Sequence, residues 1–193
     1  MTWNDHLDLI AKKVIKSTGV IAKIRHFTTL NALKLLYDAL VDPYLIYGNL
    51  IWGNTYKKRI QKSINIKKKS VRLMTFKSYL EHSEPIFKEL KILDIYKIND
   101  YLTSSFMLQY HHIKNSPEVF TNYFVINNQV HQHNTINATQ LHKSYKKTNY
   151  VKHTLSNKGV DIWNGLQSNL KKIKSCNIFK NMIKTLTNLS NLT

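Results

Sequence analysis

The 193-residue chain has little of what several classes of protein require: it contains one Cys, three Pro and five Gly. Cys176 has no partner for an intramolecular disulfide, so a disulfide-stabilised secreted scaffold is excluded and a reducing compartment suits the sequence. The scarcity of Gly and Pro argues against a loop-rich all-β fold. No apolar run approaches the length that spans a membrane, and Asp5 and Asp8 are not typical of a signal peptide. We therefore expect an intracellular protein, cytoplasmic or nuclear.

Acidic residues are also scarce. The chain has 11 Asp and Glu against 29 Lys and Arg, which gives a formal net charge of +18. Because the excess of Lys and Arg is present in both halves of the chain, a folded surface must display it. Such a surface favours an anionic partner, with nucleic acid ahead of a membrane. A biased genomic composition that favours Lys is the alternative explanation.

The usual motifs of catalysis and metal binding are missing. There is no Asp-Asp pair, no Gly-rich phosphate loop, no Gly-x-Ser-x-Gly and no His-Glu-x-x-His. His131, His133 and His142 could approach a metal, but no Cys or nearby carboxylate completes a set of four ligands. Cys176 lacks a basic neighbour that would activate it as a nucleophile. We assign no catalytic, cofactor-binding or metal-binding residue and no small-molecule substrate.

Apolar residues recur at helical spacing through much of the chain. This periodicity predicts helices over 4–25, 30–40, 57–75, 83–90 and 95–115, with a brief one at 116–123. From 124 to 149 the periodicity fades, so short strands or an irregular loop are expected there, with a strand near 150–155. Helices are expected again over 159–169 and 175–187. The sequence thus predicts a mainly α protein: a helical bundle over 1–123, and a smaller, partly irregular or β-containing part over 124–193 that ends in a helix.

The most apolar and aromatic stretch covers residues 40–56. Asp42-Pro43 is a helix-start signal, because Asp can accept from free amides and Pro at the first position loses no needed donor. Gly53-Asn54 ends the stretch in turn residues. We predict one central helix here, with Tyr44, Ile51 and Trp52 largely buried against the first two helices.

The helix predicted directly after this stretch is strongly basic. No acidic residue occurs between 57 and 77, so its cations have no Glu or Asp on the same helix to pair with. Lys67 falls within the apolar arc of the helix, so it must either reach the edge of the bundle or interrupt the apolar stripe. A solvated helix face is the alternative. The residues predicted to contact nucleic acid are Asn54, Tyr56, Lys57, Lys58, Arg59, Lys67, Lys68, Lys69 and Arg72.

Three short segments, in order along the chain, carry a resemblance to a known family. They are Thr2–His6, the pair Pro43–Tyr47 and Ile51–Asn54, and Gly159–Leu166. The first resembles the Leu-Thr-Trp-x-x-His junction of palm and thumb in LINE-type non-LTR retrotransposon reverse transcriptases, particularly jockey-like ones. The second resembles the region just after the palm, and the third the late Gly-Pro-x-x-Trp-Asn-x-Leu-Pro motif of the same family. Gln167 stands where the family usually has Pro, and Ile136 where it often has Arg.

The resemblance runs from Thr2 to roughly Thr187 and implies a thumb, a helical bundle that grips the template–primer duplex, followed by the C-terminal extension of the family. The Asp-Asp pair of the palm is absent, so the chain would not polymerise alone. We predict a C-terminal fragment of a reverse transcriptase that grips RNA or an RNA–DNA duplex, with the missing palm as a further partner. A helical protein-interaction module and a decayed retroelement remnant without selected function are the alternatives.

Overall fold

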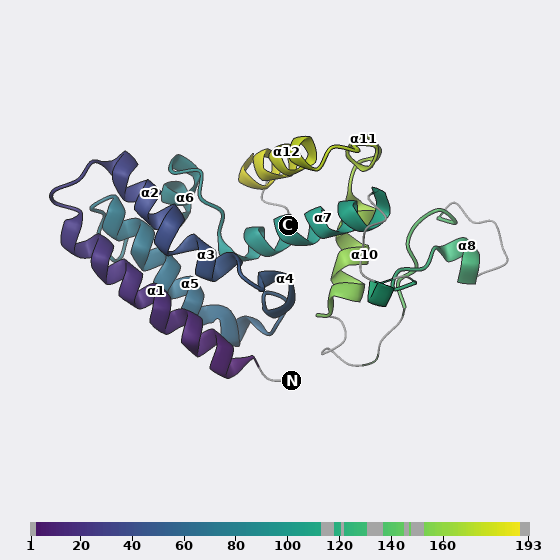
Figure 1. The fold of residues 1–193 in the computed structure, drawn as a ribbon, viewed down its shortest axis with the longest axis horizontal. Coiled ribbons are helices and arrows are strands. Elements are labelled where there is room, and N and C mark those ends of the chain that lie inside the picture. The colour runs from purple at the N-terminus through teal and green to yellow at the C-terminus, as the bar shows by residue number, and fades with distance from the viewer. Residues whose placement is uncertain are drawn as a thin grey trace. The chain divides into compact units, whose positions relative to one another are not determined.

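The computed structural model describes residues 3–112, 118–120, 122–130, 137–144, 147 and 153–189. These residues are mainly helical, as the sequence predicts (Figure 1). The chain divides into two compact units, Met1–Asn99 and Asp100–Thr193, which are described separately below. The boundary between them lies within a helix, whereas the change in composition suggests one near residue 123.

Unit 1 is a bundle in which two long helices lie along each other (Figure 1). The Asp8 carboxylate meets the Lys62 ammonium, the Thr18 hydroxyl is 2.6 Å from that of Ser70, and Arg25 Nη1 donates to the carbonyl of Leu73 at 3.4 Å. These contacts advance together along both helices, so the helices run parallel. The helices of unit 1 are α1 (Asn4–Ile24), α2 (Leu30–Leu40), α3 (Asp42–Ile46), α4 (Asn49–Trp52), α5 (Lys57–Met74) and α6 (Ser83–Glu89).

The core of unit 1 is built from the apolar stripes that the periodicity indicates. The apolar stripe of each long helix faces inward, and burying one such side chain contributes about 1.5–3 kcal/mol. Thr29 begins α2 as its N-cap, because its side chain accepts from the amide of Ala32. The buried apolar residues from α1 to α5 are Leu7, Ile10, Val14, Ile21, Leu33, Tyr37, Val41, Leu45, Trp52, Ile60, Val71 and Met74.

The stretch at 40–56 forms two short helices, α3 and α4, rather than the one central helix predicted. Gly48 separates them in a left-handed conformation, with φ of 64°, which residues with a side chain rarely adopt. The break turns α4 relative to α3, so Trp52 is buried as predicted while Tyr44 and Ile51 are exposed, Ile51 to 58%. The prediction that Tyr44 and Ile51 are core residues is therefore wrong.

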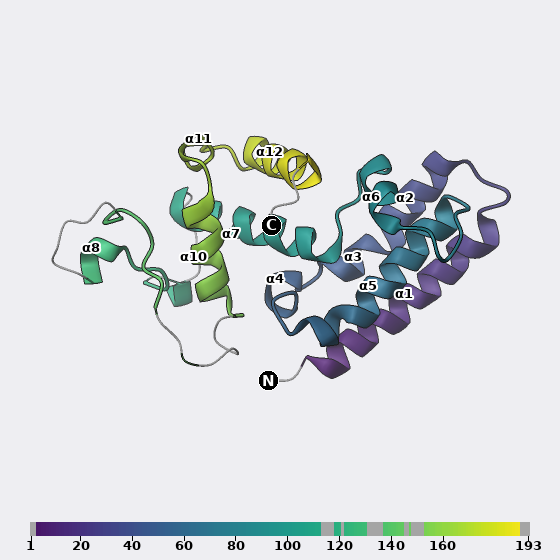
Figure 2. The same ribbon diagram turned by 180° about the vertical axis from the view of Figure 1, so that it is seen from behind.

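Unit 2 has its own core, formed mainly by the later part of α7, by α10 and by α12 (Figure 2). Met107, Phe124, Val160 and Phe179 are buried in it. The ring of Trp163 stacks on that of His111, with centroids 4.4 Å apart. The helix α7 (Ile95–His112) begins in unit 1 and continues into unit 2. The other helices of unit 2 are the 3₁₀-helix η1 (Glu118–Phe120), α8 (Asn127–Val130), α10 (Leu155–Gly165), α11 (Ser168–Lys171) and α12 (Cys176–Leu189).

The β structure predicted after residue 123 is not confirmed. Within the ranges that the structure describes there is no strand, only one isolated antiparallel bridge between Ile126 and Leu141. The strand expected at 150–155 falls partly outside the described residues, and Leu155 already begins α10. His131, His133 and the Asn134–Ile136 segment also lie outside the described residues.

The Trp163-Asn164 pair in the third segment of the resemblance contributes to the structure of unit 2, with Trp163 in its core. The Asn164 side chain accepts from the amide of Leu141 at 3.1 Å and donates to its carbonyl at 3.0 Å. An amide side chain that pairs with both backbone groups of one residue satisfies them as a neighbouring strand would. The motif thus fixes the segment around Leu141 against α10, which is a structural role.

Candidate nucleic-acid interface

The basic residues of α5 lie mainly on the side of the helix that faces away from the core. Its inward side carries Ile60, Ser63, Lys67, Ser70, Val71 and Met74, all buried. At 100° per residue, the opposite side carries six cations, four of them in the i,i+4 pairs Lys58–Lys62 and Lys68–Arg72. We call these six residues the α5 ridge, and its members are Lys57, Lys58, Lys62, Lys68, Lys69 and Arg72.

The α5 ridge is long enough to follow several nucleotides. From Lys58 to Arg72 the helix rises about 21 Å at 1.5 Å per residue, or roughly six nucleotide steps at 3.4 Å each. Lys68 and Arg72 are half-buried, and the other members are exposed. Among the described residues, Lys57, Lys58, Lys68 and Lys69 have no ion-pair partner. Mutual repulsion among these four cations is therefore relieved by water, salt or an anionic ligand.

One member of the ridge that we did not predict as a contact, Lys62, is held by an acidic side chain from α1. Its ammonium lies 2.6 Å from the Asp8 carboxylate, and both side chains are about half exposed. The hydrogen bond and the charge of Lys62 lower the pKa of Asp8. Asp8 thus occupies the position at which a phosphate would contact Lys62. Only the packing of α1 along α5 reveals this pair, because the two residues are far apart in sequence.

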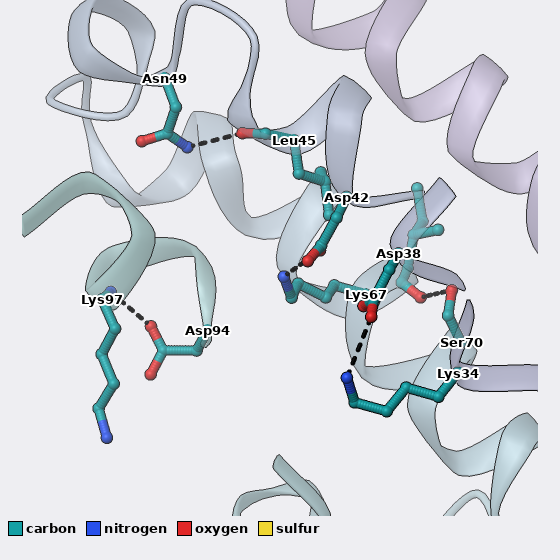
Figure 3. A network of polar contacts seen from close by, with 10 residues as sticks. Lys34, Asp38, Asp42, Leu45, Asn49, Lys67, Ser70, Asp94 and Lys97 are labelled. Atoms are coloured by element: carbon teal, nitrogen blue, oxygen red, sulfur yellow. Dashed lines mark hydrogen bonds and ion pairs between the residues drawn. The ribbon is translucent and has the colours of Figure 1, made fainter. Parts of the chain in front are cut away.

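Lys67 was predicted as a contact, but it is 1% exposed in the core of unit 1. Its ammonium lies 3.0 Å from the Asp42 carboxylate, as Figure 3 shows, and 5.6 Å from the centroid of the Tyr37 ring. Burial lowers the pKa of Lys67, and the Asp42 carboxylate opposes that effect. Lys67 neither reaches the edge of the bundle nor interrupts the stripe unpaired: it is neutralised by α3, so it is unavailable to a ligand in this fold.

Asn54 is also buried and unavailable. Its side-chain amide donates to the carbonyl of Leu50 at 2.9 Å, within the turn that follows α4. Nearby, Asn99 Nδ2 donates to the carbonyl of Asn49 at 2.8 Å. Asn54 therefore belongs to the buried turn before α5, and in this fold its side chain is not available for the predicted ligand contact.

Tyr56 and Arg59 lie together at the start of α5. Tyr56 is exposed, and Arg59 Cζ is 5.7 Å from the centroid of its ring. Arg59 also borders an open hollow of about 170 Å³ between α1 and α5, together with Lys62 and Asp8. The start of α5 thus offers an exposed ring and the Arg59 guanidinium, beside the Lys62 ammonium that Asp8 holds.

At the other end of the ridge, Arg72 combines two roles. Its Nε donates to the carbonyl of Glu81 at 2.7 Å, which ties the turn after α5 to the helix. Its guanidinium Cζ lies 5.8 Å from the centroid of the Tyr79 ring. Arg72 is therefore partly committed to the fold, and removing it would alter the turn as well as the charge.

Other kinds of site find little support in the described residues. No three His, Cys, Asp or Glu side chains come together there in a way that could hold a metal ion. No helix within the described ranges is both long and apolar enough to cross a membrane. The chemistry that the described surface offers is a row of cations with aromatic rings at its two ends.

Comparison of the chain with protein-family models, with curated proteins and with solved structures finds no match.

Proposed function

We propose that unit 1 binds a nucleic-acid backbone along the α5 ridge, through contacts to phosphates that do not read the sequence. The ridge itself carries this proposal. A helix face that only meets water usually alternates charges of both signs, which stabilises the helix by a few tenths of a kcal/mol per i,i+4 pair. In α5 every charged residue is a cation, so an anionic strand supplies the charge that the helix lacks.

A duplex of RNA, or of RNA and DNA, is the ligand of this proposal. Its support is the resemblance of three segments to LINE-type reverse transcriptases, in which the thumb grips the template–primer duplex. The chain would then be a thumb and C-terminal region that binds the duplex, with the polymerase palm as a partner. It would not catalyse polymerisation alone, because the sequence has no Asp-Asp pair.

The test is a titration of the full chain with a short fluorescent RNA–DNA duplex at several salt concentrations. The variant replaces Lys58, Lys68 and Lys69 with Gln, and it leaves Arg72 in place because Arg72 holds the turn after α5. Each lost phosphate contact lowers the slope of log affinity against log salt by about one. We expect the slope to fall by about three, with an unchanged melting temperature.

The matched control replaces Lys172, Lys174 and Lys180 of unit 2 with Gln. It removes the same charge from the chain but leaves the ridge intact, so its salt slope should equal that of the wild type. Equal losses in both variants would show that net charge alone drives binding. Unchanged binding in the ridge variant would mean that the α5 face is only solvated surface.

An exposed apolar group gives a specific reason to keep a second function, a helical protein-interaction module. Ile46, Tyr47 and Ile51 lie on α3, α4 and the turn between them, and all three are exposed. Neighbouring exposed apolar side chains are typical of surfaces that bind a protein. Sedimentation of the chain without nucleic acid would favour this function if it showed association that Tyr47→Ser and Ile51→Ser abolish.

A further inference from the structure

The end of α1 and the end of α5 meet at one end of unit 1 (Figure 2). Arg25 Nη1 donates to the carbonyl of Leu73, and its guanidinium Cζ lies 4.9 Å from the centroid of the Phe76 ring. The ring of His26 meets the same ring edge-on, with centroids 5.3 Å apart. The residues that directly follow α1 thus contact the ring that follows α5.

Phe76 has a backbone conformation that a glycine would adopt more easily. Its φ is 55°, in the left-handed region. The amide of Lys77 donates back to the carbonyl of Arg72 at 3.0 Å, which ends α5 in a Schellman motif with Phe76 at the position where Gly is usual. The left-handed conformation is unfavourable for a residue with a side chain, because Cβ crowds the following carbonyl oxygen. The chain accepts this cost and presents a ring that is 55% exposed.

Two more aromatic rings are exposed at this end. Phe27 follows α1 and is 88% exposed, and Tyr79 lies in the turn after α5 and is 75% exposed. Tyr79 lies next to the guanidinium of Arg72, the last cation of the α5 ridge. The ridge therefore leads directly into this group, which we call the aromatic end. Its members are Arg25, His26, Phe27, Arg72, Phe76 and Tyr79.

We infer that the aromatic end binds the unpaired nucleotides of a nucleic acid whose paired part lies along the α5 ridge. This inference rests on the proposed function and adds a substrate feature to it, a single-stranded overhang next to a duplex. Bases inside a duplex already stack on one another, whereas unpaired bases can stack on aromatic and guanidinium planes. The aromatic end offers such planes in its rings and in the guanidinium groups of Arg25 and Arg72.

Charge complementarity distinguishes this occupant from an apolar protein surface. An apolar partner would cover the guanidinium groups of Arg25 and Arg72 and remove their water without supplying an opposite charge. The Glu81 carboxylate is already paired with Lys77, at 2.9 Å. A nucleotide has a flat base that can stack on the rings and a phosphate that can pair with the guanidinium groups.

The test compares two RNA–DNA duplexes of equal paired length, one blunt and one with a short single-stranded overhang. Stacking of one base on a protein ring typically strengthens binding about tenfold, so we expect the wild type to bind the overhang duplex about tenfold more tightly. The variant Phe27→Ala with Tyr79→Ala should lose this preference and bind the blunt duplex as before. Both side chains are largely exposed, so the variant should fold normally.

The control variant, Leu9→Ala with Leu35→Ala, removes two exposed apolar side chains elsewhere in unit 1, and it should keep the preference. Equal binding of both duplexes by the wild type, with a weakened ridge variant, would overturn the inference and leave the proposed function standing. No binding of either duplex would overturn both. A change in self-association without a change in duplex preference would show that the aromatic end contacts protein instead.

Discussion

Replacing Asp42 with Asn tests the packing of α5 more directly than any other single change. The substitution removes the carboxylate that lies 3.0 Å from the Lys67 ammonium, and it leaves that cation buried without its counter-ion. Breaking a buried ion pair from one side costs about 3–5 kcal/mol. Since the Asp42 side chain is itself 22% exposed and water can approach it, we expect the lower end, about 3 kcal/mol, in the free energy of unfolding.

A double-mutant cycle separates the ion pair from the other effects of the substitution. Lys67→Met keeps the apolar stem and leaves Asp42 within reach of water, so we expect it to cost about 1 kcal/mol or less. The double variant, Asp42→Asn with Lys67→Met, should be more stable than Asp42→Asn alone, because it no longer buries an unpaired charge. Urea unfolding gives all three values. An Asp42→Asn variant that unfolds at the wild-type urea midpoint would refute the argument.

The pH dependence of the same variant has a definite sign. Burial lowers the pKa of Lys67, and Asp42 acts against this lowering, so Asp42→Asn brings the pKa further down. Above that lowered pKa the folded protein has released a proton that the unfolded chain keeps, and stability rises with pH. The loss caused by Asp42→Asn should therefore be largest below the lowered pKa of Lys67 in the variant and shrink as the pH rises above it. Burial raises the pKa of Tyr37. The titration of Tyr37 therefore affects stability only at higher pH, from the ordinary tyrosine pKa of about 10 upward.

Two further substitutions test neighbouring features of unit 1. Gly53→Ala would place a Cβ 2.6 Å from Asn99 Nδ2 and against the Asn49 side-chain oxygen, so we expect a loss of about 2 kcal/mol or more in stability, and an unchanged melting temperature would contradict the packing. Asp8→Asn frees Lys62, so the salt slope of duplex binding should steepen by about one. Asp5→Asn changes the same charge without freeing a cation, and equal effects of the two would contradict a specific role for the Asp8–Lys62 pair.

The sequence predicts the long helices of unit 1 well, because their bounds are set locally. The apolar stripe of α1, the Thr29 cap of α2 and the run from Lys57 to Met74 each determine a helix without help from distant residues. The break at Gly48 was missed because aromatic residues on both sides continue a helical pattern that hides it. A Gly between two apolar segments is nevertheless a local signal for a break in the helix.

The candidate site was predicted less completely, because its electrostatics depend on contacts between distant segments. The helical wheel places Lys67 in the apolar arc, but it cannot show that α3 brings Asp42 to it. In the same way Asp8 meets Lys62 only because α1 and α5 run parallel. The aromatic end was missed because its rings come from two turns that are far apart in sequence.

The buried ion pair connects the stability of unit 1 with the direction in which the α5 ridge points. A helix with cations on most of its surface has few apolar positions to determine which side faces the core. Lys67 contributes to this choice, together with the buried Ile60, Val71 and Met74, because its ammonium has a counter-ion only where it meets Asp42. A rotation of α5 by one residue, about 100°, would bring Lys68 inward in its place and move the ridge around the helix by the same angle. The pair thus favours the rotation of α5 at which Lys58, Lys68 and Lys69 face away from the core, toward any phosphate that approaches.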